Sequence, residues 1–584
     1  MPSSTVESVT LAQASSLSAT AAGRLNELVA EIAQSILQGF DKHFSVFRKI
    51  TQRGHEHFIR GEWQLSRQAA CYRISLYDQR VLEAVAVLRE RFDPGEPDPE
   101  LWQQVKFHYL GLLYRHKQPE LAETFYNSVF VCLFQRHYYN NDYIFIRPCV
   151  STERLDTSDP VYRSFYPTQQ GWRRSITNIL RQADIGLPFA DLERDVRHIA
   201  RDIRQLQNRP VQLLKHFQIQ LLRPLFYRNR TVYMVGRVIN GPDRLPFILK
   251  LRRNEHGRVH VIGLLSERDD VANLFTSARA YFLVDTEVPS AVVRFLLSIL
   301  PEKEAADIYT QIGFHKQGKA EFYRNFLDHL ARSSDLIQVA PGARGMVMLV
   351  FTLPSYPYVF KLIRDRFAPP KEVTRQQVID RYHMVKQHDR VGRMSDAWEF
   401  SYTAFPIDRF TAELLDELRS DAASQIMIED DKLIIKHLFI ERRLEPLNLY
   451  LERADAVDAA HAIQEYGNAI HEIAAAGLFP GDLLPKNFGV TRYGRVIFYD
   501  YDEVVPLGEC NFRFIPPARY PEQELAAEPW YSVAPADVFP EEFPPFLFQN
   551  RAHRTTFVRQ HKRLLDADYW KQLQQIVANG DFAD

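Results

Sequence analysis

The sequence predicts an α+β fold in two parts, a mainly helical first part and a second part of mixed helices and strands. The chain has 584 residues, more than one hydrophobic core usually organises, so we expect two or more domains. Over roughly the first 220 residues, apolar side chains recur at the spacing of an amphipathic helix. Beyond Ile337, short apolar runs of the strand type alternate with helical stretches. This change of pattern along the chain is typical of a helical domain followed by a mixed one.

The first helix is expected over residues 22–40, after a start that is biased toward serine, threonine and alanine. Its apolar residues share one helix face and predict a buried stripe. They are Leu25, Leu28, Val29, Ile32, Ile36 and Leu37. The same spacing predicts helices over 72–92, 101–114 and 190–206, and helices resume over 290–331. We expect these stripes to serve packing.

Residues 225–266 are rich in β-branched and aromatic residues and predict strands. Two turn dipeptides, Asn-Gly at 240 and His-Gly at 256, divide the segment and predict β-hairpins. Residues 201–260 hold 13 Lys and Arg against 3 Asp and Glu, a local charge of +10. This basic hairpin segment is either a solvated face or a site for a phosphorylated small molecule or an acidic protein partner.

Residues 521–550 carry six prolines and six acidic residues and no basic ones. So many prolines exclude a regular helix and predict an extended, acidic arm that wraps a surface. The arm and the basic segment are where we expect contacts with an effector and with a protein substrate.

Charge and composition exclude several classes of protein. The 72 Lys and Arg against 73 Asp and Glu leave a net charge of −1, which excludes a global basic field for nucleic acid. No apolar run approaches the roughly 20 residues that a spanning helix needs, and the start lacks the pattern of a secretory signal. We therefore expect a cytoplasmic protein without a membrane or nucleic-acid partner. The four cysteines are too few and too scattered for a disulfide framework: Cys71, Cys132, Cys149 and Cys510.

A turn that contains two glycines lies between two strand-type apolar runs, IQVA and MVMLVF. Glycines in such a turn let backbone N–H groups approach phosphate oxygens closely. Neither the GxGxxG nor the Walker GK[ST] pattern fits, so an ordinary hairpin turn is the alternative. We expect a phosphate-binding loop made of Ala340, Pro341, Gly342, Ala343, Arg344, Gly345 and Met346.

Lys361 follows sixteen residues after Gly345, inside the strand-type run YVFKLI. A lysine among apolar strand residues must find an anion or bear a desolvation penalty. In nucleotide kinases this anion is the pair of α- and β-phosphates. A lysine on an edge strand that reaches water is the alternative.

A loop with the D-x-x-x-x-N spacing, from Asp482 to Asn487, follows a helix expected over 461–476. In kinases the aspartate of this loop accepts or orients the proton of the attacking hydroxyl, and the asparagine binds a metal ion. Thirteen residues after Asn487, the strand-type run RVIFYD ends at Asp500, the position of a metal-binding aspartate. Asp502 could add a further metal ligand. These residues, in this order, predict a kinase-type site.

Two features of the expected site differ from an ordinary protein kinase. The residue before the catalytic aspartate is Gly481 instead of arginine, so no arginine is available there for a phosphorylated activation loop. The acidic partner of Lys361 is open between Glu372 and Asp380. Residues 439–448 could form the hinge that binds an adenine base.

Other functional classes fit parts of the pattern. A small-molecule phosphotransferase of the aminoglycoside or choline kinase type shares the GDxxxxN and D-x-D patterns in closer detail. A pseudokinase scaffold would retain the fold without turnover. The run FYDYDEV also fits the start of a haloacid-dehalogenase-type phosphatase, but only 82 residues follow Asp502. The permuted triplet at 388–390 is rejected as a catalytic loop because Met394 stands where the asparagine should be.

Seven unusual runs are distributed over nearly the whole chain: IAQSILQGFD, RPLFYRNR, IGFHKQGKAEFYRNF, APGARGMVM, HDRVGRMSD, IERRLEPLN and GDLLPKNFGV. Through them the chain resembles the bacterial isocitrate dehydrogenase kinase/phosphatase family. The resemblance implies a mainly helical regulatory domain at 1–335 and a bilobal protein-kinase-like catalytic domain at 336–584.

The resemblance also implies a bifunctional enzyme. Such an enzyme phosphorylates a serine of isocitrate dehydrogenase, which inactivates it, and removes the phosphate again. The family uses this to divide flux between the citric acid cycle and the glyoxylate bypass. ATP and Mg²⁺, with Mn²⁺ as an alternative, are the expected cofactors, and AMP is the expected allosteric effector. A homodimer is one of the assemblies that we consider.

The resemblance assigns roles residue by residue. It implies that the loop Ala340–Met346 and Lys361 contact ATP, and that Asp396, in the RVGRMSD run, acts chiefly in the phosphatase reaction. From the residues alone, Asp396 would be a helix cap. The other implied residues are Asp482 for catalysis and Asn487 and Asp500 for the metal. Our hypothesis is that both reactions share this site and that Asp396 or Asp502 orients a water molecule.

Overall fold

The computed structural model describes residues 6–92, 98–134, 143–153, 155, 160–206, 214, 216–275, 282–342, 344–369, 371, 373–389, 391–520 and 529–579. The chain forms two compact units. The N-terminal unit comprises Met1–Arg268 and Phe282–Leu327, and the C-terminal unit comprises Asp269–Tyr281 and Asp328–Asp584. No helix in the described ranges combines the length and apolarity that crossing a membrane requires.

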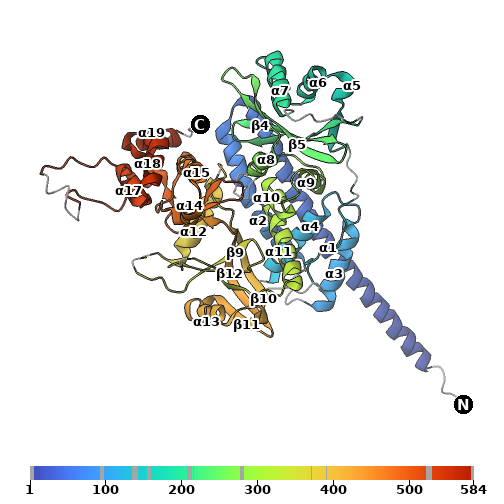
Figure 1. The fold of residues 1–584 in the computed structure, drawn as a ribbon. Helices are drawn as coiled ribbons and strands as arrows, with labels where there is room; N and C mark the ends of the chain where they lie inside the picture. Colours follow the sequence, from blue (N-terminus) through green and yellow to red (C-terminus); the bar gives the residue numbers. More distant parts are fainter. Residues whose placement is uncertain are drawn as a thin grey trace. The chain divides into compact units, whose positions relative to one another are not determined.

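Long helices open the N-terminal unit: α1 (Val6–Arg60), α2 (Trp63–Phe92), α3 (Pro99–Leu113) and α4 (Pro119–Phe134). Helix α1 extends well beyond the 22–40 expected because its apolar stripe continues through Phe44, Phe47 and Phe58, which are all buried. Helix α3 begins where Asp98 accepts hydrogen bonds from the N–H groups of Glu100 and Leu101. Figure 1 shows these helices in blue.

The second layer of this unit is an antiparallel sheet in the order β1-β2-β4-β5-β6, with β3 paired to β4. The strands are β1 (Tyr162–Phe165), β2 (Gln218–Leu222), β3 (Phe226–Arg228), β4 (Thr231–Asn240), β5 (Asp243–Arg253) and β6 (Val259–Leu265). Strands β4 and β5 meet at the Asn240-Gly241 turn, where Gly241 has a φ of 65° that suits glycine.

The remaining helices up to residue 332 are α5 (Pro167–Gln170), α6 (Trp172–Gln182), α7 (Leu192–Leu206), α8 (Arg268–Leu274), α9 (Pro289–Leu297), α10 (Ala305–Gln311) and α11 (His315–Arg332). All but the first residue of α8, and the last turn of α11, belong to the C-terminal unit. Helices α6 and α7 cover one face of the sheet (Figure 1), with Ile179 and Ile199 buried against strand residues such as Leu249. These apolar side chains exclude water from the face of the sheet that α6 and α7 cover.

Part of the positive charge of the basic segment is used inside the N-terminal unit. Arg237 donates to the Ser298 hydroxyl over 2.5 Å, and its guanidinium lies 4.4 Å from the ring centre of Phe295. Arg253 donates to the Ile59 carbonyl over 3.2 Å. These arginines hold helices to the sheet, so the segment is more than a solvated face.

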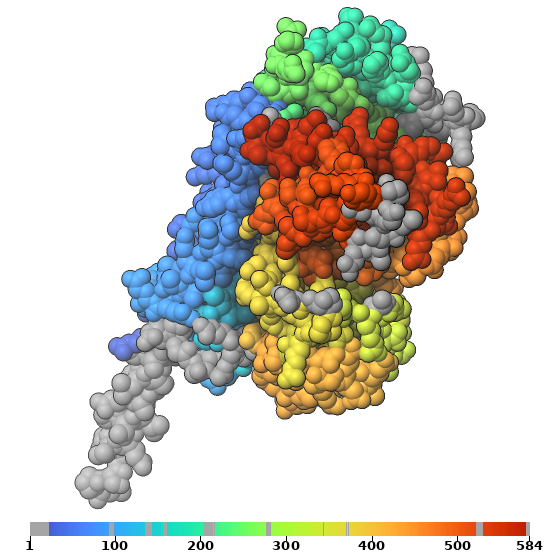
Figure 2. All heavy atoms as spheres, turned by 90° about the vertical axis from the view of Figure 1, so that its left-hand side faces the viewer, coloured from blue at the N-terminus to red at the C-terminus, as the bar shows by residue number. Residues whose placement is uncertain are grey.

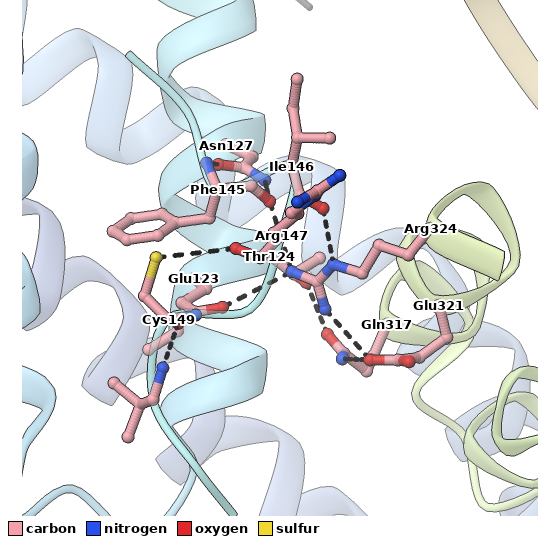
Figure 3. A network of polar contacts seen from close by, with 12 residues as sticks. Glu123, Thr124, Asn127, Phe145, Ile146, Arg147, Cys149, Gln317, Glu321 and Arg324 are labelled. Carbon is pink, nitrogen blue, oxygen red and sulfur yellow. Dashed lines mark hydrogen bonds and ion pairs between the residues drawn. The ribbon is translucent and has the colours of Figure 1, made fainter. Parts of the chain in front are cut away.

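A buried network joins α4, α11 and the segment 143–150 (Figure 3). The Glu123 carboxylate accepts hydrogen bonds from the N–H groups of Cys149 and Val150 over 2.9 and 3.2 Å. Arg324 lies 3.5 Å from Glu123 and donates to the carbonyls of Phe145 and Ile146. Arg324 also pairs with Glu321 over 3.0 Å, whereas Glu123, whose side chain is fully buried, depends on the charge of Arg324.

The C-terminal unit begins with a second antiparallel sheet, in the order β10-β12-β9-β8-β7, with β11 paired to β12. Its strands are β7 (Gln338–Val339), β8 (Met348–Thr352), β9 (Tyr358–Ile363), β10 (Trp398–Pro406), β11 (Ile426–Glu429) and β12 (Lys432–Arg442). Helices α12 (Arg375–His388) and α13 (Ala412–Asp421) belong to this layer. Lys361 lies on the inner strand β9, opposite Val350 of β8 and Phe439 of β12. The lysine is therefore not on an edge strand.

A mainly helical layer follows the sheet. Its helices are α14 (Leu447–Arg453), α15 (Ala456–Ala475), α17 (Phe543–Leu547), α18 (Arg551–Gln560) and α19 (Ala567–Ala578). Its short strands are β13 (Glu445–Pro446), β14 (Leu478–Phe479), β15 (Phe488–Val490), β16 (Val496–Phe498), β17 (Val505–Pro506), β18 (Asn511–Phe512) and β19 (Asp537–Val538). Tyr466 of α15 and Trp570 of α19 are fully buried in its core. Figure 2 shows the C-terminal helices in red packed beside the orange α14–α15 region.

The expected extended arm at 521–550 is only partly extended. Residues 521–528 lie outside the described residues. In the described remainder, β19 pairs in parallel with β18, and Phe543–Leu547 forms the short helix α17. This short helix forms in a proline-rich segment because both prolines of α17 lie in its first turn, where a proline removes no hydrogen bond.

Candidate active site

Lys361 forms a buried ion pair with Glu441, at the end of β12. The lysine ammonium lies 3.0 Å from the Glu441 carboxylate, and the two side chains are 8% and 1% exposed. The same ammonium donates to the Tyr499 carbonyl over 2.8 Å. Burial is the main cause that raises the pKa of Glu441, and Lys361 opposes it. A lysine held in this way presents its charge in a fixed place, as a phosphate-binding lysine requires.

The structure corrects the expected partner of Lys361. Glu372 lies outside the described residues. Asp380 is exposed on α12 and accepts a hydrogen bond from Gln376 over 2.9 Å. Glu441 takes the role because the antiparallel register places Phe439 opposite Lys361, and the residue two positions further along the strand lies on the same face.

The D-x-x-x-x-N loop is held by hydrogen bonds at both ends. The Asp482 carboxylate accepts from the Leu484 N–H over 2.9 Å. The side-chain amide of Asn487, which is 4% exposed, donates to the Asp482 carbonyl over 3.3 Å. The Tyr499 N–H donates to the Asn487 carbonyl over 3.1 Å. The loop is therefore fastened to the segment that leads to Asp500.

The structure explains why position 481 is a glycine. Its φ is 76°, and a Cβ atom at this position would lie 2.3 Å from the Glu503 carbonyl oxygen. Any side chain would push the D-x-x-x-x-N loop away from the Asp500–Glu503 segment.

The two aspartates at the end of β16 interact with each other and with cations. Burial, and next the negative charge of Asp502, raises the pKa of Asp500 to about 7. The Lys371 ammonium lies 2.9 Å from the Asp502 carboxylate and also pairs with Glu503. Arg381 of α12 donates to the Asp502 carbonyl. Neither Lys371 nor Arg381 was predicted, since no spacing rule marks them.

Asp396 lies at the end of a loop that is paired to β16. The Ser395 N–H donates to the Phe498 carbonyl over 2.9 Å, and the Phe498 N–H donates to the Arg393 carbonyl over 2.8 Å. The Tyr501 hydroxyl donates to the Ser395 carbonyl over 2.6 Å. Asp396 is buried, and its negative charge contributes to raising the pKa of Glu441, so the two carboxylates lie near each other.

This loop is also attached to α15 through a buried arginine. Arg393, which is 3% exposed, donates to Glu465 and Glu472 over 2.7 and 2.9 Å. At the start of the loop, the Asp389 carboxylate accepts from the N–H groups of Val391 and Gly392. Asp389 thus serves as a cap of the turn.

The expected phosphate loop connects β7 to β8. Ala340 donates its N–H to the Val350 carbonyl over 2.9 Å, and Gly342 has a φ of 118°. A Cβ atom on Gly345 would lie 2.8 Å from the Met348 carbonyl oxygen. Ala343 lies outside the described residues, whereas Pro341 and Met346 lie in the described parts of the loop. The backbone conformation at Gly342 and the close carbonyl at Gly345 thus both favour glycine over a residue with a side chain.

Arg344 leaves the loop toward α13. Its guanidinium lies 2.8 Å from Glu413 and 3.1 Å from Glu417, and its side chain is 58% exposed. The structure therefore places Arg344 in exposed ion pairs with α13.

The expected metal ligands fit a magnesium-type ion by their chemistry. Among the described residues, no group of three or more His, Cys, Asp and Glu side chains is arranged to hold a metal ion. Magnesium in kinase sites needs fewer protein ligands, since one or two carboxylates act together with substrate phosphates and waters. Asn487, Asp500 and Asp502 supply only oxygen ligands, the type that magnesium prefers.

A buried lysine–carboxylate pair, a D-x-x-x-x-N loop and two aspartates at a strand end define an ATP-dependent phosphotransferase of the kinase class. A family model described as "Isocitrate dehydrogenase kinase/phosphatase (AceK) kinase domain" matches residues 335–584, and one described as the regulatory domain of the same protein matches residues 33–334. The chain belongs to the isocitrate dehydrogenase kinase/phosphatase family.

Curated relatives with this family name are similar to the chain over most of their length. An isocitrate dehydrogenase kinase/phosphatase of Aromatoleum aromaticum is 50% identical over 559 residues, which cover 96% of this chain and 95% of the relative. A protein of the same name from Azoarcus sp. is 48% identical over 560 residues, covering 96% and 95%. One from Burkholderia thailandensis is 46% identical over 558 residues, covering 95% and 92%.

The resemblance that the sequence runs predicted is therefore confirmed, as is the assignment to a bifunctional kinase and phosphatase. The chain combines a helical N-terminal regulatory domain with a C-terminal kinase domain, and helices and sheets are both present. The alternative of an aminoglycoside or choline kinase type is not favoured.

Proposed function

We propose that one site, built on Lys361, Asp482, Asn487 and Asp500, carries both the kinase and the phosphatase reaction. One observation carries the proposal, a continuous path of hydrogen bonds through the site. Lys361 donates to the Tyr499 carbonyl, the Tyr499 N–H donates to the Asn487 carbonyl, and the Asn487 side chain donates to the Asp482 carbonyl. The path fixes the phosphate-binding, metal-binding and catalytic residues relative to one another.

For the kinase reaction, Lys361 contacts the α- and β-phosphates of ATP and the loop Ala340–Met346 covers them. Asp482, which is partly exposed, orients the hydroxyl of the acceptor serine. Residues 439–448, which begin in β12 and continue past its end, place the adenine base. This assignment treats the C-terminal unit as a bilobal protein-kinase-like domain, with the sheet layer and the helical layer as its lobes.

The proposed metal ligands are Asn487, Asp500 and Asp502. A bound Mg²⁺ or Mn²⁺ ion would neutralise charge on the phosphates during transfer. The chain's own contribution is to hold Asn487 buried beside the catalytic loop and to keep two carboxylates together at the end of β16.

For the phosphatase reaction, we assign Asp396 the orientation of the attacking water molecule. Its support is the pairing of its loop to β16, which brings a second carboxylate to the Lys361–Glu441 side of the site. Asp502 is the alternative residue for this role. Since hydrolysis would use the same phosphate and metal contacts, adenine nucleotide should remain bound.

The protein substrate in this proposal is isocitrate dehydrogenase, phosphorylated on a serine and thereby inactivated. Reversal of the reaction would control flux between the citric acid cycle and the glyoxylate bypass in the cytoplasm. The regulatory part is proposed as 1–335 and the catalytic part as 336–584, which the family-model ranges 33–334 and 335–584 support. AMP as effector and a homodimer are further proposals, tested by calorimetric titration with AMP and by sedimentation.

The test of the acceptor uses the full chain, radiolabelled ATP with Mg²⁺, and purified isocitrate dehydrogenase. Label should enter the dehydrogenase band, and should leave it again after exchange of ATP for ADP. In the Asp396→Asn variant, labelling should persist while release slows by at least about tenfold. Equal damage to both directions would contradict a selective role of Asp396, and label in a small solute would contradict the protein substrate.

A further inference from the structure

The segment between β9 and α12 supplies a cation to the Asp500–Asp502 pair. The Lys371 ammonium lies 2.9 Å from Oδ2 of Asp502 and also contacts the Glu503 carboxylate. The side chains of Lys371 and Asp502 are only 15% and 12% exposed. Solvent therefore screens this ion pair much less than a surface pair.

The pairing of Lys361 with Glu441 gives this contact its importance. In protein kinases the glutamate that pairs with the phosphate-binding lysine comes from a helix, so movement of the helix controls the pair. Here both partners belong to adjacent strands of one sheet, and α12 contributes no partner among the described residues. The contacts from α12 and from the segment before it reach Asp502 instead, through Arg381 and Lys371.

A divalent cation and Lys371 compete for the same carboxylate. Oδ2 of Asp502 accepts the hydrogen bond from Lys371, and this oxygen is also one that a metal ion would use. An ammonium group beside a bound divalent cation is also repelled by it. Metal binding through Oδ2 must therefore displace Lys371, and binding through the other oxygen of Asp502 would hold two cations beside each other against their repulsion.

We propose that Lys371 is a positioning residue that holds the Asp502 carboxylate and restrains divalent-cation binding at the Asp500–Asp502 pair. The inference rests on the metal site proposed above. If Lys371 acts in this way, the β9–α12 segment controls the affinity of the site for a divalent cation, whereas the Lys361–Glu441 pair does not change.

The test measures binding of Mn²⁺ alone to the full chain, by electron paramagnetic resonance of the free ion. In Lys371→Met the dissociation constant should fall by at least about threefold, since a repelling charge is removed and Asp502 is freed. In Lys371→Arg, which keeps the charge and the hydrogen bonds, it should stay within about twofold of the wild type. A lysine that merely supports the fold predicts weaker binding in Lys371→Met, and unchanged or weaker binding overturns the proposal.

Three further variants separate the explanations. Lys436→Met removes the same charge from β12, where Lys436 donates to the Ser424 carbonyl, and should leave the Mn²⁺ dissociation constant unchanged. In an Asp502→Asn background, Lys371→Met should lose the part of its effect that comes from freeing the Asp502 carboxylate and keep only the part that comes from removing the repelling charge. Lys371→Gln makes the same charge change should Lys371→Met fail to fold.

Asp500→Asn distinguishes failure of this inference from failure of the metal site itself. If Asp500→Asn binds Mn²⁺ as the wild type does, the proposed metal site is wrong. If it loses binding while Lys371→Met does not gain it, only the restraint by Lys371 is wrong.

Discussion

The Lys361 ammonium lies 3.0 Å from the Glu441 carboxylate, and the two residues belong to adjacent strands, β9 and β12, of one antiparallel sheet. The pair is thus formed by the sheet itself and needs no movement of a helix. Both side chains are almost fully buried, so loss of either partner leaves an uncompensated charge.

The first prediction concerns this pair. Glu441→Gln should lower the rate of phosphate transfer to isocitrate dehydrogenase by about 10- to 100-fold, since Lys361 loses the charge that orients it. The matched control is Asp380→Asn, an exposed residue of α12 that pairs with Gln376, which should stay within about twofold of the wild type. Initial rates of label transfer measure both. A larger loss in Asp380→Asn than in Glu441→Gln would return the role to α12.

The second prediction follows from the backbone at Gly481. Gly481→Ala should destabilise the chain by about 2 kcal/mol or more, because φ is positive and the new Cβ would overlap the Glu503 carbonyl. It should also abolish label transfer, since Asp482 is the next residue. Gly508→Ala is the control, since a Cβ there meets no atom within 4 Å and φ is not in the positive range. Urea denaturation measures the free energy of unfolding, and equal stability of the two variants would refute the steric argument.

The third prediction concerns the buried network of the N-terminal unit. Arg324→Met should cost about 3–5 kcal/mol of unfolding free energy, because Glu123 stays buried without its cation. Addition of Glu123→Gln should recover part of this loss. Arg197→Met, which removes an exposed pair with Glu193, should cost at most about 0.5 kcal/mol. Comparable losses in the two single arginine variants would show that Arg324 is not acting through its buried pair.

The fourth prediction is a pH dependence in the absence of metal. Burial, and next the charge of Asp502, raises the pKa of Asp500 to about 7, above its ordinary value of 3.8. Between pH 3.8 and about 7, the folded chain holds a proton on Asp500 that the unfolded chain has lost, and this difference favours the folded state. The stabilisation is complete below pH 3.8 and is lost as pH rises to about 7.

Asp500→Asn removes the ionised form and should raise stability at pH 8 by about 1–3 kcal/mol in chelator-treated protein. At pH 5 the difference from the wild type should be much smaller. Thermal unfolding at the two pH values measures it. Asp389, whose pKa burial also raises to about 7, contributes a slope of the same sign that both proteins share. A variant with equal or lower stability than the wild type at pH 8 would contradict the raised pKa.

The order of the candidate site residues along the chain could be predicted, because each lies in a local sequence pattern. Lys361 stands in an apolar strand run, and Asp482 and Asn487 share a loop of fixed spacing. Glu441 could have been found by the reasoning used for Lys361, since it ends the apolar run LIIKHLFIE. Its identity as the partner depends on the register between β9 and β12, strands about 80 residues apart in sequence, which no local pattern gives.

The remaining parts of the site depend on long-range pairing. Asp396 reaches the site because residues 393–395 pair with Phe498, about 100 residues later. Lys371 lies in a connection without periodicity, so its contact with Asp502 has no sequence signal. The short helix α17 does not follow from the number of prolines in its segment, because what permits it is the position of both prolines in its first turn.

If one site serves both reactions, the Asp500→Ala substitution should damage both of them. Both activities are measured on the same preparation, as label transfer to isocitrate dehydrogenase and as release of label from the phosphorylated dehydrogenase with Mg²⁺ and adenine nucleotide. A shared site predicts that both rates fall together by at least about 100-fold. Loss of the kinase reaction with full retention of metal-dependent phosphatase activity would contradict it.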